Sequence, residues 1–201
     1  MNDDNLSHKG RVAPGLPDEL FERGAVPLTK SEIRCLTLAR LDLREGQTVL
    51  DVGAGSGGLT VECSLLLKQG RVYAVEREAE AVALIRANCK RFGLNNVTLL
   101  EGEAPEILKG VAYADRIIVG GSGGKLSSIL EKAYTLLPEG GKVVINCLLL
   151  ETLAGSLRLL AASGFIESSY IQAAISRSQE LGGGTYLKPI NPVYIVSARK
   201  G

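Results

Sequence analysis

The chain has 201 residues, of which 45% are hydrophobic and 22% are charged, and this balance is typical of a soluble globular protein. Its formal net charge of +1 argues against a general nucleic-acid binder. No run of residues approaches the roughly 20 apolar positions that a membrane span requires. We therefore expect neither a nucleic-acid partner nor a membrane partner.

Residues 1–15 are polar and include Gly10, Pro14 and Gly15, a composition typical of a flexible tail. They lack the apolar block of a signal peptide, which favours a cytoplasmic protein. The cysteines lie far apart, so we expect buried thiols and no metal site. No linker interrupts the rest of the chain. The sequence thus predicts a tail over residues 1–15 and one domain over residues 16–201.

The segment PLTKSEIRCLTLARL, residues 27–41, predicts a helix that opens with a capping box of Thr29 and Glu32. Beyond it, apolar runs alternate with apolar residues at helical spacing, which predicts strands and helices in turn. The five predicted strands are 48–53, 71–76, 97–102, 115–121 and 141–150. The last of them is continuously apolar, so we expect it in the middle of the sheet with both faces covered.

After Gly164 the pattern changes to two long strand-like segments separated by a loop of glycine and proline. No helix pattern lies between the segments, so they predict an antiparallel hairpin that closes one edge of the sheet. The whole pattern predicts an α/β, Rossmann-like fold with a mostly parallel seven-stranded sheet and an antiparallel C-terminal hairpin.

The stretch TVLDVGAGSGGLTVE, residues 48–62, passes from a strand through a glycine loop into a helix. Gly53, Gly55 and Gly58 match G-x-G-x-x-G, and Glu76 ends the next strand, where a carboxylate accepts hydrogen bonds from ribose hydroxyls. These features suit NAD and S-adenosylmethionine (SAM) equally, and the glycine motif alone is weak evidence.

Further details favour SAM. Asp51 lies two residues before the first glycine, a position that is usually apolar in NAD loops. The acidic segment EGEAPE, residues 101–106, follows the third strand and offers Glu103 and the backbone of Ala104 to an adenine edge. No residues remain for a separate substrate domain. We therefore expect a class I SAM-dependent methyltransferase, with an NAD-dependent oxidoreductase as the less favoured alternative.

Longer segments carry a more specific signal. GLPDELFERGAVPLTKSEIRCLTLARLDL, VLDVGAGSGGLTVE, YAVERE, EGEAPE and DRIIVGGSGG together resemble the cobalt-precorrin C15-methyltransferases (decarboxylating) of anaerobic cobalamin synthesis, the CbiT family. They are also similar to the C-terminal half of precorrin-6Y C5,15-methyltransferase. The resemblance implies methylation of a precorrin at C15, decarboxylation of its C12 acetate, SAM as cofactor, and a homotetramer.

The resemblance also implies roles for individual residues. It assigns Thr29 to SAM contact, the glycine loop to the cofactor, Glu76 to the ribose and the Ala104 backbone to the adenine. Many relatives have Asp at position 103, where this chain has the longer Glu103. The motifs and the resemblance together give these candidate cofactor-binding residues: Thr29, Asp51, Gly53, Ala54, Gly55, Ser56, Gly57, Glu76, Glu103 and Ala104.

A precorrin carries many carboxylates, so cations and helix N-terminal amides are the candidate substrate contacts. They are Lys30, Arg34, Gly121, Ser122, Gly123, Gly124, Lys125, Arg177 and Lys188. No catalytic residue is assigned, and His8 is the only histidine.

The alternative functions are a methyltransferase for RNA, protein or another small molecule and a non-catalytic SAM-binding module. The N/D-P-P-Y motif common in amino-methylating nucleic-acid enzymes is replaced here by VGGSGG. The sequence leaves open whether the substrate carries cobalt and whether decarboxylation precedes methylation.

Overall fold

The computed structural model describes residues 13–201. Of the expected tail, residues 1–12 lie outside the described part, and residues 13–15 pack against the folded body. Ala13 is buried in an apolar cluster with Leu16 and Phe21. The backbone N–H of Gly15 donates to Glu62 Oε2 at 2.7 Å. The folded body therefore includes residues 13–15.

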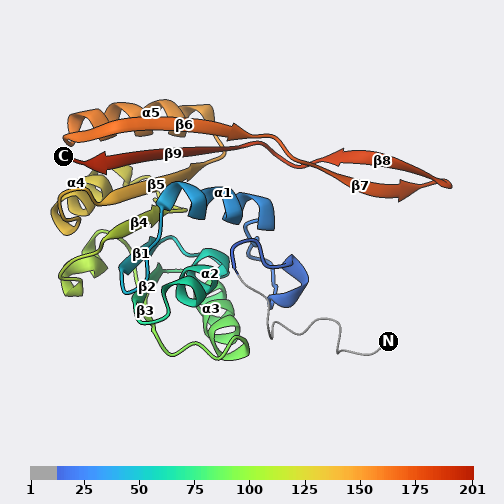
Figure 1. Ribbon diagram of the computed structural model, residues 1–201, viewed down its shortest axis with the longest axis horizontal. Coiled ribbons are helices and arrows are strands. Elements are labelled where there is room, and N and C mark those ends of the chain that lie inside the picture. The colour runs from blue at the N-terminus through green and yellow to red at the C-terminus, as the bar shows by residue number, and fades with distance from the viewer. Residues whose placement is uncertain (1–12) are drawn as a thin grey trace.

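A seven-stranded sheet forms the centre of the molecule, with the strand order β3-β2-β1-β4-β5-β9-β6 (Figure 1). Strands β1 to β5 are parallel, whereas β9 pairs antiparallel with both β5 and β6. This confirms the mostly parallel sheet with an antiparallel C-terminal hairpin at one edge. The strands are β1 (Thr48–Val52), β2 (Arg71–Glu76), β3 (Val97–Glu101), β4 (Arg116–Val119), β5 (Lys142–Cys147), β6 (Phe165–Ala173) and β9 (Val193–Lys200).

Helices cover both faces of the sheet. On one face α4 and α5 bury their apolar stripes against Leu50 and Ile117, and on the other α1 and α2 pack against Val49 and Ile118. The helices are α1 (Ser31–Leu41), α2 (Gly58–Leu67), α3 (Ala79–Arg91), α4 (Leu126–Leu136) and α5 (Leu150–Ala162), with short 3₁₀ helices η2 (Asp18–Leu20) and η3 (Glu106–Gly110). Within residues 13–201, no helix is long and apolar enough to cross a membrane.

The C-terminal hairpin is longer and more divided than expected. Beyond the β6–β9 pair the same chain segments form a second antiparallel pair, β7 (Ser176–Leu181) and β8 (Gly184–Pro189). This pair projects away from the sheet (Figure 1). The expected loop is therefore reduced to a tight turn at residues 182–183, with β7 and β8 extending on either side.

Two local expectations are wrong. The fifth strand ends at Cys147, and Leu148, Leu149 and Leu150 are more than 60% exposed because they extend past the last residue that pairs with β9. Helix α1 has no capping box, since its N-cap is Lys30 and no side chain of the N-cap closes it. Instead Asp18 Oδ1 accepts the N–H of Ser31 at 3.0 Å, so a carboxylate from η2 serves this helix end.

Candidate functional site

The glycine loop lies where β1 and β4 end side by side. A Cβ added to Gly53 would lie 2.6 Å from the backbone nitrogen of Gly121, so the two loops touch through backbone and only glycine fits. Gly55 has a φ of +58°, and a Cβ there would meet only Val26 Cγ1, at 4.0 Å. The backbone of Gly55 thus borders open space, as expected of a cradle for a ligand.

Glu76, at the end of β2, is held by backbone amides. Its Oε2 accepts the N–H of Gly55 at 2.9 Å, and its Oε1 accepts those of Arg77 at 2.7 Å and Glu78 at 3.0 Å. The side chain is 8% exposed. The three amides fix the direction of the carboxylate and leave part of its acceptor capacity directed at the neighbouring cavity.

That cavity, which we call the Glu76 cavity, has a volume of about 210 Å³. It opens at the carboxyl ends of β1, β2, β3 and β4, where parallel sheets of this type bind ligands. The sequence-predicted residues that line it are Gly53, Glu76, Glu103, Ala104, Gly121, Ser122 and Gly123. The structure thereby brings the glycine loop, the β2 carboxylate and the EGEAPE segment around one space.

Glu103 is tied to two cations at the rim of this cavity. Its Oε1 accepts from Arg77 Nη1 at 2.7 Å and its Oε2 from Lys125 Nζ at 2.8 Å. The hydrogen bond from Lys125, followed by that from Arg77, lowers the pKa of Glu103. Lys125 also pairs with Glu106 at 3.0 Å. Lys125 therefore lies beside Glu103 without lining the cavity, and two carboxylates already occupy its ammonium group.

On the other side of Gly53 lies a larger, mostly apolar cleft of about 390 Å³, which we call the Asp51 cleft. Its volume falls within the range of small-molecule sites, about 300–1,000 Å³. The sequence-predicted residues that line it are Thr29, Lys30, Asp51, Gly53, Ala54 and Gly55. Ser56 and Gly57 lie behind the loop, where Asn88 Nδ2 donates to the Ser56 carbonyl at 2.9 Å.

Asp51 is 1% exposed, and its Oδ2 accepts from Thr60 Oγ1 at 2.6 Å. Burial, with a smaller contribution from the charge of Glu76, raises the pKa of Asp51 to about 6. A buried carboxylate beside a cleft favours a cationic group in that cleft, because a nearby positive charge offsets the cost of desolvation.

The cleft includes residues that sequence reasoning missed. Asn146, near the end of β5, lines it, and its Oδ1 accepts a hydrogen bond from the hydroxyl of buried Thr37 at 3.2 Å. Asn191 lines it from the segment between β8 and β9, and Leu148, Ile190 and Val193 add apolar surface. A polar residue inside the apolar run VVINCLLL was the available signal for Asn146. Asn191 had none, because its placement depends on how the hairpin packs.

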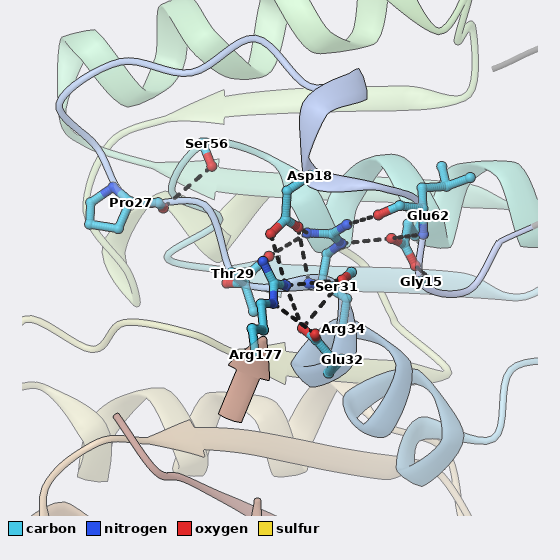
Figure 2. A network of polar contacts seen from close by, with 11 residues as sticks. Gly15, Asp18, Pro27, Thr29, Ser31, Glu32, Arg34, Ser56, Glu62 and Arg177 are labelled. Carbon is cyan, nitrogen blue, oxygen red and sulfur yellow. Dashed lines mark hydrogen bonds and ion pairs between the residues drawn. The ribbon is translucent and has the colours of Figure 1, made fainter. Parts of the chain in front are cut away.

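Arg34 lies within a network of polar contacts that joins Asp18, Glu62 and Thr29 (Figure 2). It lines neither the Glu76 cavity nor the Asp51 cleft. Its side chain is 0% exposed, with Nη1 at 2.9 Å from Asp18 Oδ1 and Nε at 2.6 Å from Glu62 Oε1. The same guanidinium donates to the carbonyls of Leu16 and Thr29. The expectation of a substrate contact is therefore corrected: these internal partners occupy Arg34, so it supports the fold beneath Thr29.

The remaining candidate cations differ in their surroundings. Lys30 is half-buried in the Asp51 cleft, and among residues 13–201 it makes no ion pair with a carboxylate. Arg177 is bound to Glu32 and Asp18. Lys188 is exposed on β8, opposite Arg177, and Gly124 lines neither cavity. Of these residues, the structure brings only Lys30 to the cleft.

Comparisons with known proteins give a consistent result. Residues 19–200 match the family model described as the precorrin methyltransferase domain. The chain is 40% identical over 193 residues to a Saccharolobus solfataricus protein named probable cobalt-precorrin-6B C(15)-methyltransferase (decarboxylating), with 94% of this chain and 97% of that protein covered.

Solved structures agree. A Geobacter metallireducens precorrin-6y C5,15-methyltransferase superimposes with a TM-score of 0.88 at 34% identity, covering 92% of this chain and 98% of that one. The structure of a Methanobacterium thermoautotrophicum protein titled precorrin 8W decarboxylase gives a TM-score of 0.86 at 36% identity, covering 90% and 98%. Since the family model spans nearly the whole chain and the curated relative is similar over its full length, the chain belongs to the precorrin methyltransferase family.

Proposed function

We propose that this chain is a SAM-dependent C-methyltransferase that methylates a (cobalt-)precorrin at C15 and decarboxylates its C12 acetate, a step of cobalamin biosynthesis. The observation that carries the proposal is the pair of cavities that meet at Gly53, one lined by carboxylates and backbone and the other mostly apolar. A site of this form accommodates a nucleoside on one side and an organic methyl acceptor on the other. The names of the relatives support the choice of acceptor.

The residues of the two cavities fit SAM. Glu76 offers acceptor positions for ribose hydroxyls, and the Ala104 backbone borders the same cavity on the adenine side. Asp51 lies across the glycine loop, where its buried carboxylate suits the ammonium group of the methionine moiety. The open space at Gly55 leaves room for the part of SAM that joins the ribose to the methionine ammonium group. When bound there, SAM supplies an electrophilic methyl group.

The Asp51 cleft suits one edge of the ring that accepts the methyl group. Its apolar walls, which include Leu28, Ile33 and Ile190, exclude water from the reacting carbon and from the carboxylate that is lost. Lys30 offers a cation to a ring carboxylate, and Asn146 offers an amide fixed by its bond to Thr37. The protein's contribution is then to hold donor and acceptor at near-attack geometry in a dry site.

We further propose a single domain, which extends the predicted residues 16–201 by the packed residues 13–15, together with a cytoplasmic location and a homotetramer. The projecting β7–β8 pair exposes Leu181 and Tyr186 on one face and Leu187 on the other, which offers apolar side chains to a partner subunit. Light scattering of the purified protein tests the tetramer.

Two measurements test the function. In calorimetry, SAM should bind and NAD should not, which separates the methyltransferase from an oxidoreductase. Incubation with methyl-labelled SAM and a cobalt-precorrin should give a product that, by mass spectrometry, has gained one labelled methyl group and lost one carbon dioxide. Binding of SAM without any change in the precorrin would contradict the proposed acceptor.

A further inference from the structure

Arg177 connects the projecting hairpin to the start of α1 (Figure 2). From β7, its Nε donates to Glu32 Oε1 at 2.8 Å and its Nη2 to Glu32 Oε2 at 2.6 Å, the two-pronged geometry of a strong ion pair. Its Nη2 also reaches Asp18 Oδ2 at 3.2 Å and Ser31 Oγ at 3.3 Å. A single side chain thus joins residues more than 140 positions apart in the sequence.

On the α1 side, these contacts lead to one wall of the Asp51 cleft. The other oxygen of Asp18 accepts the N–H of Ser31 and a bond from Arg34, and Arg34 also holds the carbonyl of Thr29. Thr29 and Lys30 line the cleft. This wall is fixed by Arg34 and Asp18, so it does not depend on Arg177 for its position.

On the hairpin side, the contacts lead to the opposite wall. The N–H of Ile190 donates to the carbonyl of Ile175 at 2.9 Å, two residues before Arg177. Ile190 and Asn191 line the cleft, and Val193 follows at the start of β9. Beyond the hydrogen bond between Ile190 and Ile175 the hairpin projects into solvent, and the side chains of β7 and β8 are almost all exposed. Ile175 and Val193 pack against the apolar cluster that contains Ile33, and the ion pair at Arg177 adds a charged side-chain connection between this wall and the one formed by residues 26–33.

We propose that Arg177 is a positioning residue that sets the width of the Asp51 cleft by clamping the Ile190–Asn191 wall against the start of α1. The proposal rests on the proposed function, in that the cleft is where the precorrin binds. It assigns Arg177 a role different from a direct contact with a substrate carboxylate. The pKa of Glu32, lowered to about 2 chiefly by its hydrogen bond with Arg177, keeps the clamp charged at every working pH.

The test replaces Arg177 and a matched arginine. Arg199 on β9 pairs with Glu167 through the same two-pronged geometry, at 3.0 and 2.6 Å, and lines neither cavity. Misplacement of a binding wall costs up to about a hundredfold in rate, so Arg177→Gln should lower kcat/KM for the precorrin by about ten- to a hundredfold, mainly through KM. SAM affinity, measured by calorimetry, should change by less than about threefold, because Thr29 keeps its own supports. Arg199→Gln should change neither quantity.

Glu32→Gln separates a clamp from a direct contact. If Arg177 positions the wall, Glu32→Gln should raise KM as Arg177→Gln does, and the double variant should be no worse than the worse single variant. If Arg177 instead binds substrate, Glu32→Gln frees its guanidinium and KM should stay the same or fall, which would overturn the proposal.

Hydrogen exchange gives a readout that needs no substrate. The Ile190 amide should exchange faster in Arg177→Gln than in wild type, with the β5 amides unchanged, and equal exchange at Ile190 would contradict the clamp. Should the wild-type protein fail to convert the precorrin, the proposed function would fall, while this exchange measurement would still decide whether the clamp exists.

Discussion

Glu76 and Asp51 lie in neighbouring strands, yet their surroundings differ. Three backbone amides hold Glu76, whereas Asp51 accepts one hydroxyl and lies in an apolar setting that raises its pKa to about 6. The first arrangement fixes a direction for hydrogen bonding. The second stores a desolvation cost that a cationic ligand offsets. Each carboxylate therefore predicts a different response to substitution.

Glu76→Ala should weaken SAM binding by about ten- to over a hundredfold, because a hydrogen bond to a charged group contributes roughly 1.5–3 kcal/mol. Glu101→Ala is the matched control. Glu101 ends β3 directly opposite Glu76 of β2, and it lines neither the Glu76 cavity nor the Asp51 cleft. Calorimetry with SAM measures both. Unchanged affinity in Glu76→Ala would remove Glu76 from the cofactor site.

Asp51→Asn should stabilise the ligand-free protein and weaken SAM binding. The folded pKa of Asp51 lies above its ordinary value of 3.8, so the folded chain holds the proton more tightly than the unfolded chain. Between those two pKa values the stability contributed by Asp51 falls as pH rises, and above about pH 6 the ionised group costs roughly 3 kcal/mol.

The measurement is urea unfolding and SAM affinity from about pH 5 to about pH 8. Wild type should bind SAM more weakly as pH falls through about 6, since the proton neutralises Asp51, and Asp51→Asn should lose much of this dependence. A variant that is less stable than wild type at the upper pH and binds SAM equally well would contradict this assignment.

At the scale of elements, η2, α1 and α2 meet around Arg34. The guanidinium lies 4.6 Å from the Phe21 ring centroid and pairs with two carboxylates that are almost fully buried. Removing one partner of such a group leaves uncompensated charge in the interior, which is far more costly than losing an exposed pair.

Arg34→Met should therefore lower the free energy of unfolding by about 3–5 kcal/mol. The exposed pair at Arg199 provides the comparison, and Arg199→Met should cost less than about 1 kcal/mol. Adding Glu62→Gln to Arg34→Met should restore part of the loss, because it removes one of the unpaired charges. Urea denaturation measures all three, and equal losses for the two arginines would refute the buried network.

The elements that follow from local pattern were predictable from sequence. The glycine loop and Glu76 directly follow or end predicted parallel strands, whose carboxyl ends meet at one edge of the sheet. Their positions in the sequence were therefore enough to predict that they lie close together. Arg34 was misassigned because composition shows a charge but not its partners. Arg34 precedes Thr37, Leu38 and Leu41 by three, four and seven residues, which places it on the buried face of α1. A prediction that follows only the apolar residues overlooks this, because Arg34 is charged. Asn191 and the Arg177 contacts depend on the packing of a distant hairpin, which no local pattern encodes.

At the scale of the whole molecule, the chemistry is expected to need no histidine. The only histidine, His8, lies outside the described residues, and neither cavity includes one. Loss of carbon dioxide from the acetate leaves an electron pair that conjugation delivers to the ring carbon. A proton-abstracting base is then unnecessary, and positioning accounts for the protein's part.

Deletion of residues 1–12, or His8→Ala, should leave decarboxylating methylation within about threefold of wild type, since the packed residues from Ala13 onward remain. Turnover with saturating SAM and precorrin measures it. A collapse of kcat with both ligands still bound would show that His8 takes part in the reaction.

Our central inference is that the Glu76 cavity and the Asp51 cleft together serve both the methyl transfer and the decarboxylation. Its most direct test is the ratio of carbon dioxide released to S-adenosylhomocysteine formed when the purified chain acts on a cobalt-precorrin whose C12 acetate carboxyl is labelled. Equal amounts in wild type, falling together in Glu76→Ala, are the predicted result. Methyl transfer without release of labelled carbon dioxide, or no S-adenosylhomocysteine while SAM and precorrin are both bound, would contradict it.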